Sequence, residues 1–110
     1  QVAIRPEGVA RIRAGGAPFH EAVARQVELY PHFASRGYTH LHDPLAVATV
    51  IRPELVRLEP LHVDVEMEGR HAAGATLVRA PSAEAPANAG VALGVEARRF
   101  EEFLVERLAG

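Results

Sequence analysis

The stretch His40-Leu41-His42-Asp43-Pro44-Leu45-Ala46-Val47-Ala48 places two histidines and an aspartate directly before a proline and an apolar run. Asp43 is a residue type that caps helix N-termini, and Pro44 suits the first helical position, where its missing N–H has no partner to lose. The residues from Leu45 to Ile51 are apolar on all sides, which is typical of a buried helix. The stretch therefore predicts a polar site at the N-terminus of a buried helix.

Upstream of this stretch, the sequence predicts two helices and a loop. The first helix runs from Pro6 to Ala14, and the second begins at Pro18. The expected core face of the second helix consists of Phe19, Val23, Val27 and Tyr30. Pro31 should end or kink this helix, so residues 32–41 are expected to form an irregular loop.

Downstream of Pro53, which should stop the helix, the pattern changes to strands. Alternating apolar residues predict strands at 56–65, 75–79 and 91–95, and a final amphipathic helix at 98–108. Phe100, Phe103, Leu104 and Leu108 should face inward in that helix. The expected fold is α/β, in which helices precede a small three-stranded β-meander and a terminal helix, and residues 1–110 form a single unit.

Composition excludes several classes of protein. The chain has 110 residues and a net charge of −2, and its 12 basic residues are all arginines scattered along the sequence. This distribution argues against a nucleic-acid partner and against a membrane partner. The absence of cysteine rules out disulfides. With no leader-like segment, the expected location is cytoplasmic.

Four segments carry a recognisable order of motifs. They are Leu41–Ala48, Pro53–Leu55, the Leu-His-Val-Asp-Val-Glu strand at 61–66, and Asn88–Leu93 ahead of an Arg-Phe-Glu helix. Together they resemble the C-terminal part of the inosine-uridine preferring nucleoside hydrolases, over nearly the whole chain. The most specific piece is His-Asp-Pro-x-Ala at 42–46.

The resemblance implies a mostly parallel α/β sheet and hydrolysis of the N-glycosidic bond of purine or pyrimidine ribonucleosides to base and ribose. It implies that Asp43 is a calcium ligand and that His42 protonates the leaving base. Tyr30 and Tyr38 would border the base pocket. These roles agree with the chemistry of the side chains, because calcium binds carboxylate oxygens and histidine can carry a proton near neutral pH.

One family motif has no counterpart here. The resemblance implies an Asp-x-Asp-x-x-x-Asp-Asp segment that supplies most calcium ligands and the general base, whereas Asp43 and Asp64 are the only aspartates in this chain. We therefore expect a piece of a longer ribonucleoside hydrolase that is inactive alone and self-associates. The start at Gln1 and the all-apolar helix support this expectation. The alternative is a self-standing domain that binds a small ligand or a protein without chemistry.

Plainer roles remain open for the same residues. Asp43 could serve only as a helix cap, and His42 only as a loop histidine bonded to the backbone. Tyr30 could pack in the core and Tyr38 could be simply exposed. The His40-x-His42-Asp43 order also permits a transition-metal site, although no further ligand cluster supports one.

Overall fold

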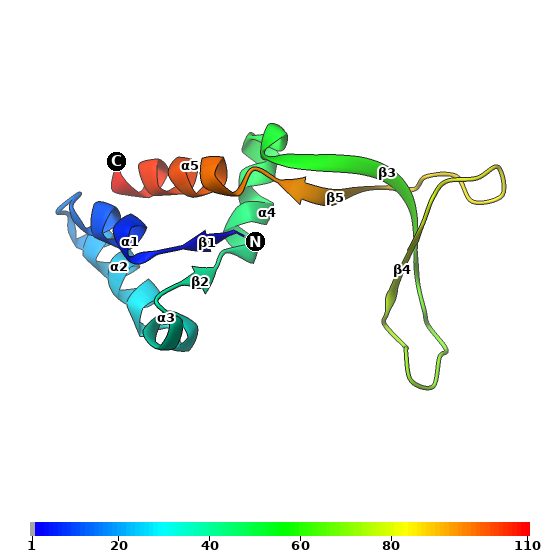
Figure 1. Ribbon diagram of the computed structural model, residues 1–110, viewed down its shortest axis with the longest axis horizontal. Helices are drawn as coiled ribbons and strands as arrows, with labels where there is room; N and C mark the ends of the chain where they lie inside the picture. The colour runs from blue at the N-terminus through cyan, green and yellow to red at the C-terminus, as the bar shows by residue number, and fades with distance from the viewer. Residues whose placement is uncertain (1) are drawn as a thin grey trace. The chain divides into compact units, whose positions relative to one another are not determined.

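Helices and two small sheets make up the computed structural model, which describes residues 2–110 (Figure 1). The elements are β1 (Ala3–Ile4), α1 (Pro6–Arg13), α2 (Pro18–Leu29), α3 (Pro31–Arg36), β2 (Thr39–His40), α4 (His42–Ile51), a 3₁₀ turn (Pro53–Leu55), β3 (Val56–Val65), β4 (Thr76–Arg79), β5 (Ala89–Val95) and α5 (Ala97–Ala109). This confirms the α/β class, the three-stranded sheet and the terminal helix. The chain packs as two compact units, one formed by the residues up to Val56 together with Val95–Gly110, the other by Arg57–Gly94.

The core of the first unit lies where α1 packs against α2 and α5. Its largest fully buried side chains are Phe100, Ile4, Ile12, Leu55, Val9 and Val105. Gly8 allows the close approach of α1 to its neighbours, because a Cβ there would lie 3.1 Å from Ile4 Cγ1 and 3.2 Å from Val105 Cγ2. The expected inward face of α5 is confirmed, with Phe100 fully buried and Phe103, Leu104 and Leu108 packed against the core.

The prediction of an irregular loop at residues 32–41 is wrong in its first half. Pro31 ends α2 and also occupies the first position of α3, where a proline loses no hydrogen bond. Gly37 then ends α3 with a φ of 74°, a conformation that glycine adopts without steric cost. The next residues form β2, which pairs antiparallel with β1 so that His40 lies opposite Ala3. A two-residue strand has no sequence pattern of its own.

The prediction that Asp43 caps α4 is also wrong. The helix begins at His42 and its N-cap is Leu41, with no side-chain cap hydrogen bond. Pro44 then occupies the third helical position, which is compatible with the helix because the first four N–H groups have no partner within it. Asp43 lies in the first turn, where a negative charge is favourable.

The expected burial of α4 is not observed within residues 2–110. Ala48 is buried, whereas Val47, Val50 and Ile51 are 66%, 84% and 62% exposed. One side of the helix therefore packs in the first unit and an apolar side faces outward. No helix in the described residues is long and apolar enough to cross a lipid bilayer.

The second unit is a three-stranded sheet with β3 in the centre. The strand order is β4-β3-β5, so β5 lies beside β3. In a meander with strands in sequential order, β5 would lie beside β4 instead. β3 and β4 are antiparallel, with Val63 opposite Val78. The expected strands agree with the observed ones to within two residues at each end.

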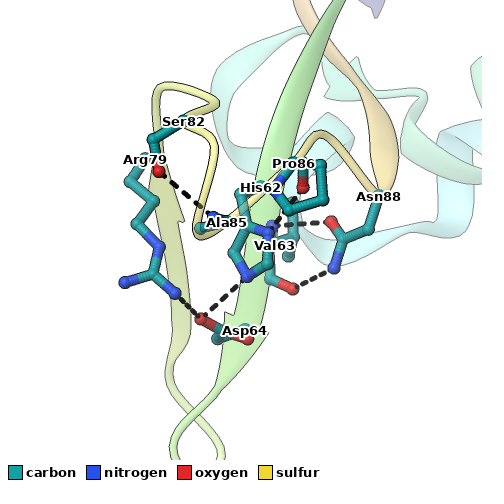
Figure 2. Close-up of polar contacts among 8 residues, drawn as sticks. All are labelled: His62, Val63, Asp64, Arg79, Ser82, Ala85, Pro86 and Asn88. Atoms are coloured by element: carbon teal, nitrogen blue, oxygen red, sulfur yellow. Dashed lines mark hydrogen bonds and ion pairs between the residues drawn. The ribbon is translucent and has the colours of Figure 1, made fainter.

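Side chains fix the segment between β4 and β5 to the central strand (Figure 2). His62 Nδ1 lies 2.7 Å from the carbonyl oxygen of Pro86, and its Nε2 lies 3.3 Å from Asp64 Oδ2. The same carboxylate oxygen accepts a hydrogen bond from Arg79 Nη2 at 2.8 Å. This segment is thus held in place although most of its residues are exposed.

Candidate active site

Two adjoining hollows lie at the N-terminus of α4, both within the first unit. One has a volume of about 220 Å³ and is lined by three histidines, two tyrosines, Arg36 and Thr39. The other has a volume of about 420 Å³ and extends along α2 to Asp43 and Pro44. Tyr30, Thr39, His40 and His42 line both hollows, so the two lie side by side and are treated together as the candidate site.

All four residues singled out from the sequence line this site. His42 and Tyr30 line both hollows, Tyr38 lines the smaller one and Asp43 the larger one. They come from three places in the chain: the junction of α2 and α3, the segment before β2, and the first turn of α4. The fold therefore brings the candidate residues together, while their individual roles stay predictions.

His42 is the first residue of α4 and is exposed. Its ring stacks on the ring of His40, with centroids 5.5 Å apart and planes inclined by 29°. An exposed imidazole at the wall of a hollow can reach a bound molecule and exchange a proton with it. This position is compatible with the role expected for His42.

Asp43 follows His42 in the first turn of α4 and is also exposed. Among residues 2–110, the structure gives its carboxylate no hydrogen bond and no ion pair. It is the carboxylate that lines the larger hollow. A free carboxylate at this position is available to bind a cation or a hydroxyl group.

The two tyrosines lie at the rim of the site. Tyr30 is 50% exposed and Tyr38 is 37% exposed, so the alternative of core packing for Tyr30 is wrong. The Tyr30 ring meets His32 edge to face at 5.5 Å, and the Tyr38 ring meets His40 in the same way at 5.6 Å. Exposed aromatic rings at a rim can stack on a planar ligand.

Sequence reasoning missed several polar residues of the site, among them His32 and Arg36. Both belong to α3, a helix that the sequence analysis assigned to a loop, and both line the smaller hollow. Their spacing of four residues is the signal that could have placed them on one helical face. Arg36 brings a positive charge to the smaller hollow, whereas Asp43 brings a negative charge to the larger one.

The chain that carries this site matches known proteins in sequence and in fold. A family model described as inosine-uridine preferring nucleoside hydrolase matches residues 1–102. The chain belongs to this family. The family predicted from the order of the sequence motifs is therefore confirmed.

Curated nucleoside hydrolases are identical to this chain at about a third of the aligned positions. The non-specific ribonucleoside hydrolase RihC of Escherichia coli O7:K1 is 35% identical over 85 residues, which cover 74% of this chain and 28% of that protein. The protein of the same name from Shigella boydii gives the same figures. The chain thus spans less than a third of the length of these nucleoside hydrolases.

Solved structures of nucleoside hydrolases match the chain along its whole length. The purine-preferring ribonucleoside hydrolase from Gardnerella vaginalis matches with a TM-score of 0.87 and 26% identity, over 100% of this chain and 36% of that one. A plant nucleoside hydrolase matches with a TM-score of 0.80 at 21% identity, which supports the fold alone. The described fold is therefore that of a part of a nucleoside hydrolase.

Proposed function

We propose that this chain is the C-terminal part of a ribonucleoside hydrolase and contributes His42 and Asp43 to its active site. The observation that carries the proposal is the convergence of His42, Asp43, Tyr30 and Tyr38 on two adjoining hollows in a member of the nucleoside hydrolase family. The names of the similar proteins, which include non-specific and purine-preferring ribonucleoside hydrolases, support a ribonucleoside as substrate.

In the proposed reaction, water attacks C1′ of the ribose and the C1′–N bond breaks. The departing base keeps the electron pair of that bond, and His42 donates a proton to it, so that a neutral base and ribose result. The proton lost by the water goes to a general base that we expect outside this chain. Tyr30 and Tyr38 would hold the base at the rim of the site by stacking.

Calcium is the proposed metal, but this chain alone does not fit a complete calcium site. No three histidine, aspartate or glutamate side chains of the described residues come together so that they could hold a metal ion. Calcium takes about six to eight oxygen ligands, and Asp43 offers one carboxylate. Asp43 would therefore be one ligand among several, with the others supplied from outside this chain.

Two further proposals follow from the small share of the family domain that this chain spans. The isolated chain is inactive, because it holds a proton donor without the general base or the remaining metal ligands. It self-associates through apolar surface such as the exposed side of α4. The cytoplasm remains the proposed location.

A self-standing binding domain without chemistry is the second candidate function. The exposed tyrosines and histidines around the two hollows would then recognise a small planar ligand without cleaving it. This candidate predicts binding of a nucleoside or base to the isolated chain.

The deciding experiment compares two proteins: the isolated chain and the product of the complete open reading frame that encodes it. Each is incubated with inosine or uridine in the presence of calcium, and the release of hypoxanthine or uracil is followed. We expect release by the complete product and none by the isolated chain. Release by the isolated chain in proportion to its concentration contradicts the proposed incompleteness, and binding without release by both proteins favours the binding domain.

A further inference from the structure

Three rings follow one another along the segment that leads into α4. Tyr38 precedes β2, His40 is the last residue of β2, and His42 is the first residue of α4. Tyr38 meets His40 edge to face at 5.6 Å, and His40 stacks on His42 at 5.5 Å. His40 therefore lies in the middle of a row of rings that ends at the proposed proton donor.

The backbone fixes His40 within this row. Its Nδ1 lies 3.2 Å from the carbonyl oxygen of Val2, which also accepts a hydrogen bond from the backbone N–H of Leu41 at 3.2 Å. Because a carbonyl oxygen can only accept, His40 Nδ1 carries the hydrogen of this bond. The pairing of β1 with β2 holds the same region, with Ala3 opposite His40.

His42 itself has fewer constraints. It is exposed at the first position of α4, and within residues 2–110 the structure gives its side chain no hydrogen bond. The stacked ring of His40 is a contact that can restrict where the imidazole of His42 points. A proton donor that can rotate freely spends only part of its time in the orientation that reaches the departing base.

We propose that His40 is a positioning residue for His42: anchored to Val2 through Nδ1, its ring holds the ring of His42 at the wall of the two hollows. This inference rests on the proposed function, because it assigns His40 a part in proton donation by His42. It gives His40 a role other than the transition-metal ligand that the His-x-His order permits, and it needs no contact between His40 and the substrate.

The test uses three variants that separate the ring from its anchor. His40→Ala removes both, His40→Asn keeps a donor near the Val2 carbonyl but loses the ring, and His40→Phe keeps a flat ring but loses the donor. His71→Ala is the matched control, because His71 is an exposed histidine of the second unit. The protein used is the complete gene product that contains this chain, with inosine as substrate.

We expect His40→Ala and His40→Asn to lower kcat about tenfold with KM nearly unchanged, because orientation of a proton donor acts on the transition state and not on substrate binding. His40→Phe should recover most of the loss. His71→Ala should leave both constants unchanged. If His40→Ala fails to fold without the anchor, the contrast between Asn and Phe still decides the question.

A second readout needs no activity. At a fixed pH and without substrate, the NMR coupling constants that report the χ1 rotamer of His42 should become averaged in His40→Ala and His40→Asn and stay unchanged in His71→Ala. An unchanged His42 rotamer, or a loss confined to KM, would overturn the positioning role. If the wild-type protein releases no base at all, the proposed function fails, whereas the His42 rotamer still decides whether His40 positions His42.

Discussion

Asn88 joins both polar groups of its side-chain amide to the backbone of Val63. Its Oδ1 accepts a hydrogen bond from the Val63 N–H at 2.8 Å, and its Nδ2 donates one to the Val63 carbonyl at 2.9 Å. The amide thereby makes the two hydrogen bonds that the backbone of a paired strand would make to Val63, just before β5 begins (Figure 2). The contact fixes where the segment after β4 returns to β3.

Replacing Asn88 by alanine should therefore loosen the second unit locally. Each hydrogen bond is worth about 0.5–1.5 kcal/mol and two are lost, so we expect the Val63 amide to exchange its hydrogen about 5- to 150-fold faster. Asn88→Asp should not restore the protection fully, because its second carboxylate oxygen would face the Val63 carbonyl oxygen and neither can donate. Unchanged protection of the Val63 amide in Asn88→Ala would show that the contact adds nothing to local stability.

The close approach of α1 to α5 depends on Gly8. Gly8→Val should destabilise the first unit by about 1–3 kcal/mol, because the added methyl groups meet Ile4 and Val105 where a Cβ alone is already 3.1–3.2 Å from them. Gly8→Ala should be much milder, since the better helix propensity of alanine offsets part of the crowding. Denaturant unfolding measures both, and equal stabilities of the two variants would contradict the account.

Stability should also fall at acidic pH through one ion-pair network. Arg13 donates hydrogen bonds to Glu28 at 2.7 and 2.8 Å and to Glu21 at 2.8 Å, and the bond from Arg13 lowers the pKa of the Glu28 carboxyl from its usual 4.5. A lowered folded-state pKa gives a contribution that is present above the unfolded pKa and is lost as pH falls through the folded value.

Arg13→Gln should therefore reduce the melting temperature near neutral pH and flatten its decline below about pH 4.5. The effect should be small, because both side chains are partly exposed and screened by solvent. Arg25→Gln is the control, since Arg25 has no ion pair among residues 2–110. A pH profile of Arg13→Gln parallel to that of the wild type would be evidence against a pKa shift at Glu28.

The outward side of α4 gives a prediction about association. Replacing Val47 and Val50 by lysine should change the free energy of unfolding of the isolated chain by no more than about 0.5 kcal/mol, because both side chains are exposed. The same double variant should lower light scattering if this surface drives self-association. Ala48→Lys, at the buried position between them, should instead unfold the chain. Undiminished scattering of the double variant would place the association elsewhere.

Prolines at helix starts and the spacing of apolar residues predicted those elements that depend mainly on local sequence. Pro6 and Pro18 begin helices as expected, and the apolar spacing of α5 correctly identified Phe100 as a core residue. Elements that depend on distant partners were not predictable in this way. The strands β1 and β2 exist through their mutual pairing, and the position of β5 beside β3 follows from contacts with no local pattern.

The residues of the site also fall into those that the sequence predicted and those that required the fold. The family resemblance pointed to His42, Asp43, Tyr30 and Tyr38, but no local pattern showed that Tyr30, twelve residues before His42, lines the same hollows. Pro31 explains part of this difficulty, because it both stops α2 and starts α3, and only the second role brings His32 and Arg36 to the site. The alternation of Tyr38, His40 and His42 was visible in the sequence, whereas the stacking of His40 on His42 required the fold.

The most direct test of the central claim compares two substrates in a His42→Ala variant of the complete gene product. The base of inosine needs a proton in order to leave. The nitrophenolate of a nitrophenyl riboside leaves as a stable anion and needs none. We expect a loss in kcat of about 10²- to 10⁴-fold with inosine and little loss with the nitrophenyl riboside. Equal losses with both substrates, or full activity of His42→Ala on inosine, would contradict proton donation by His42.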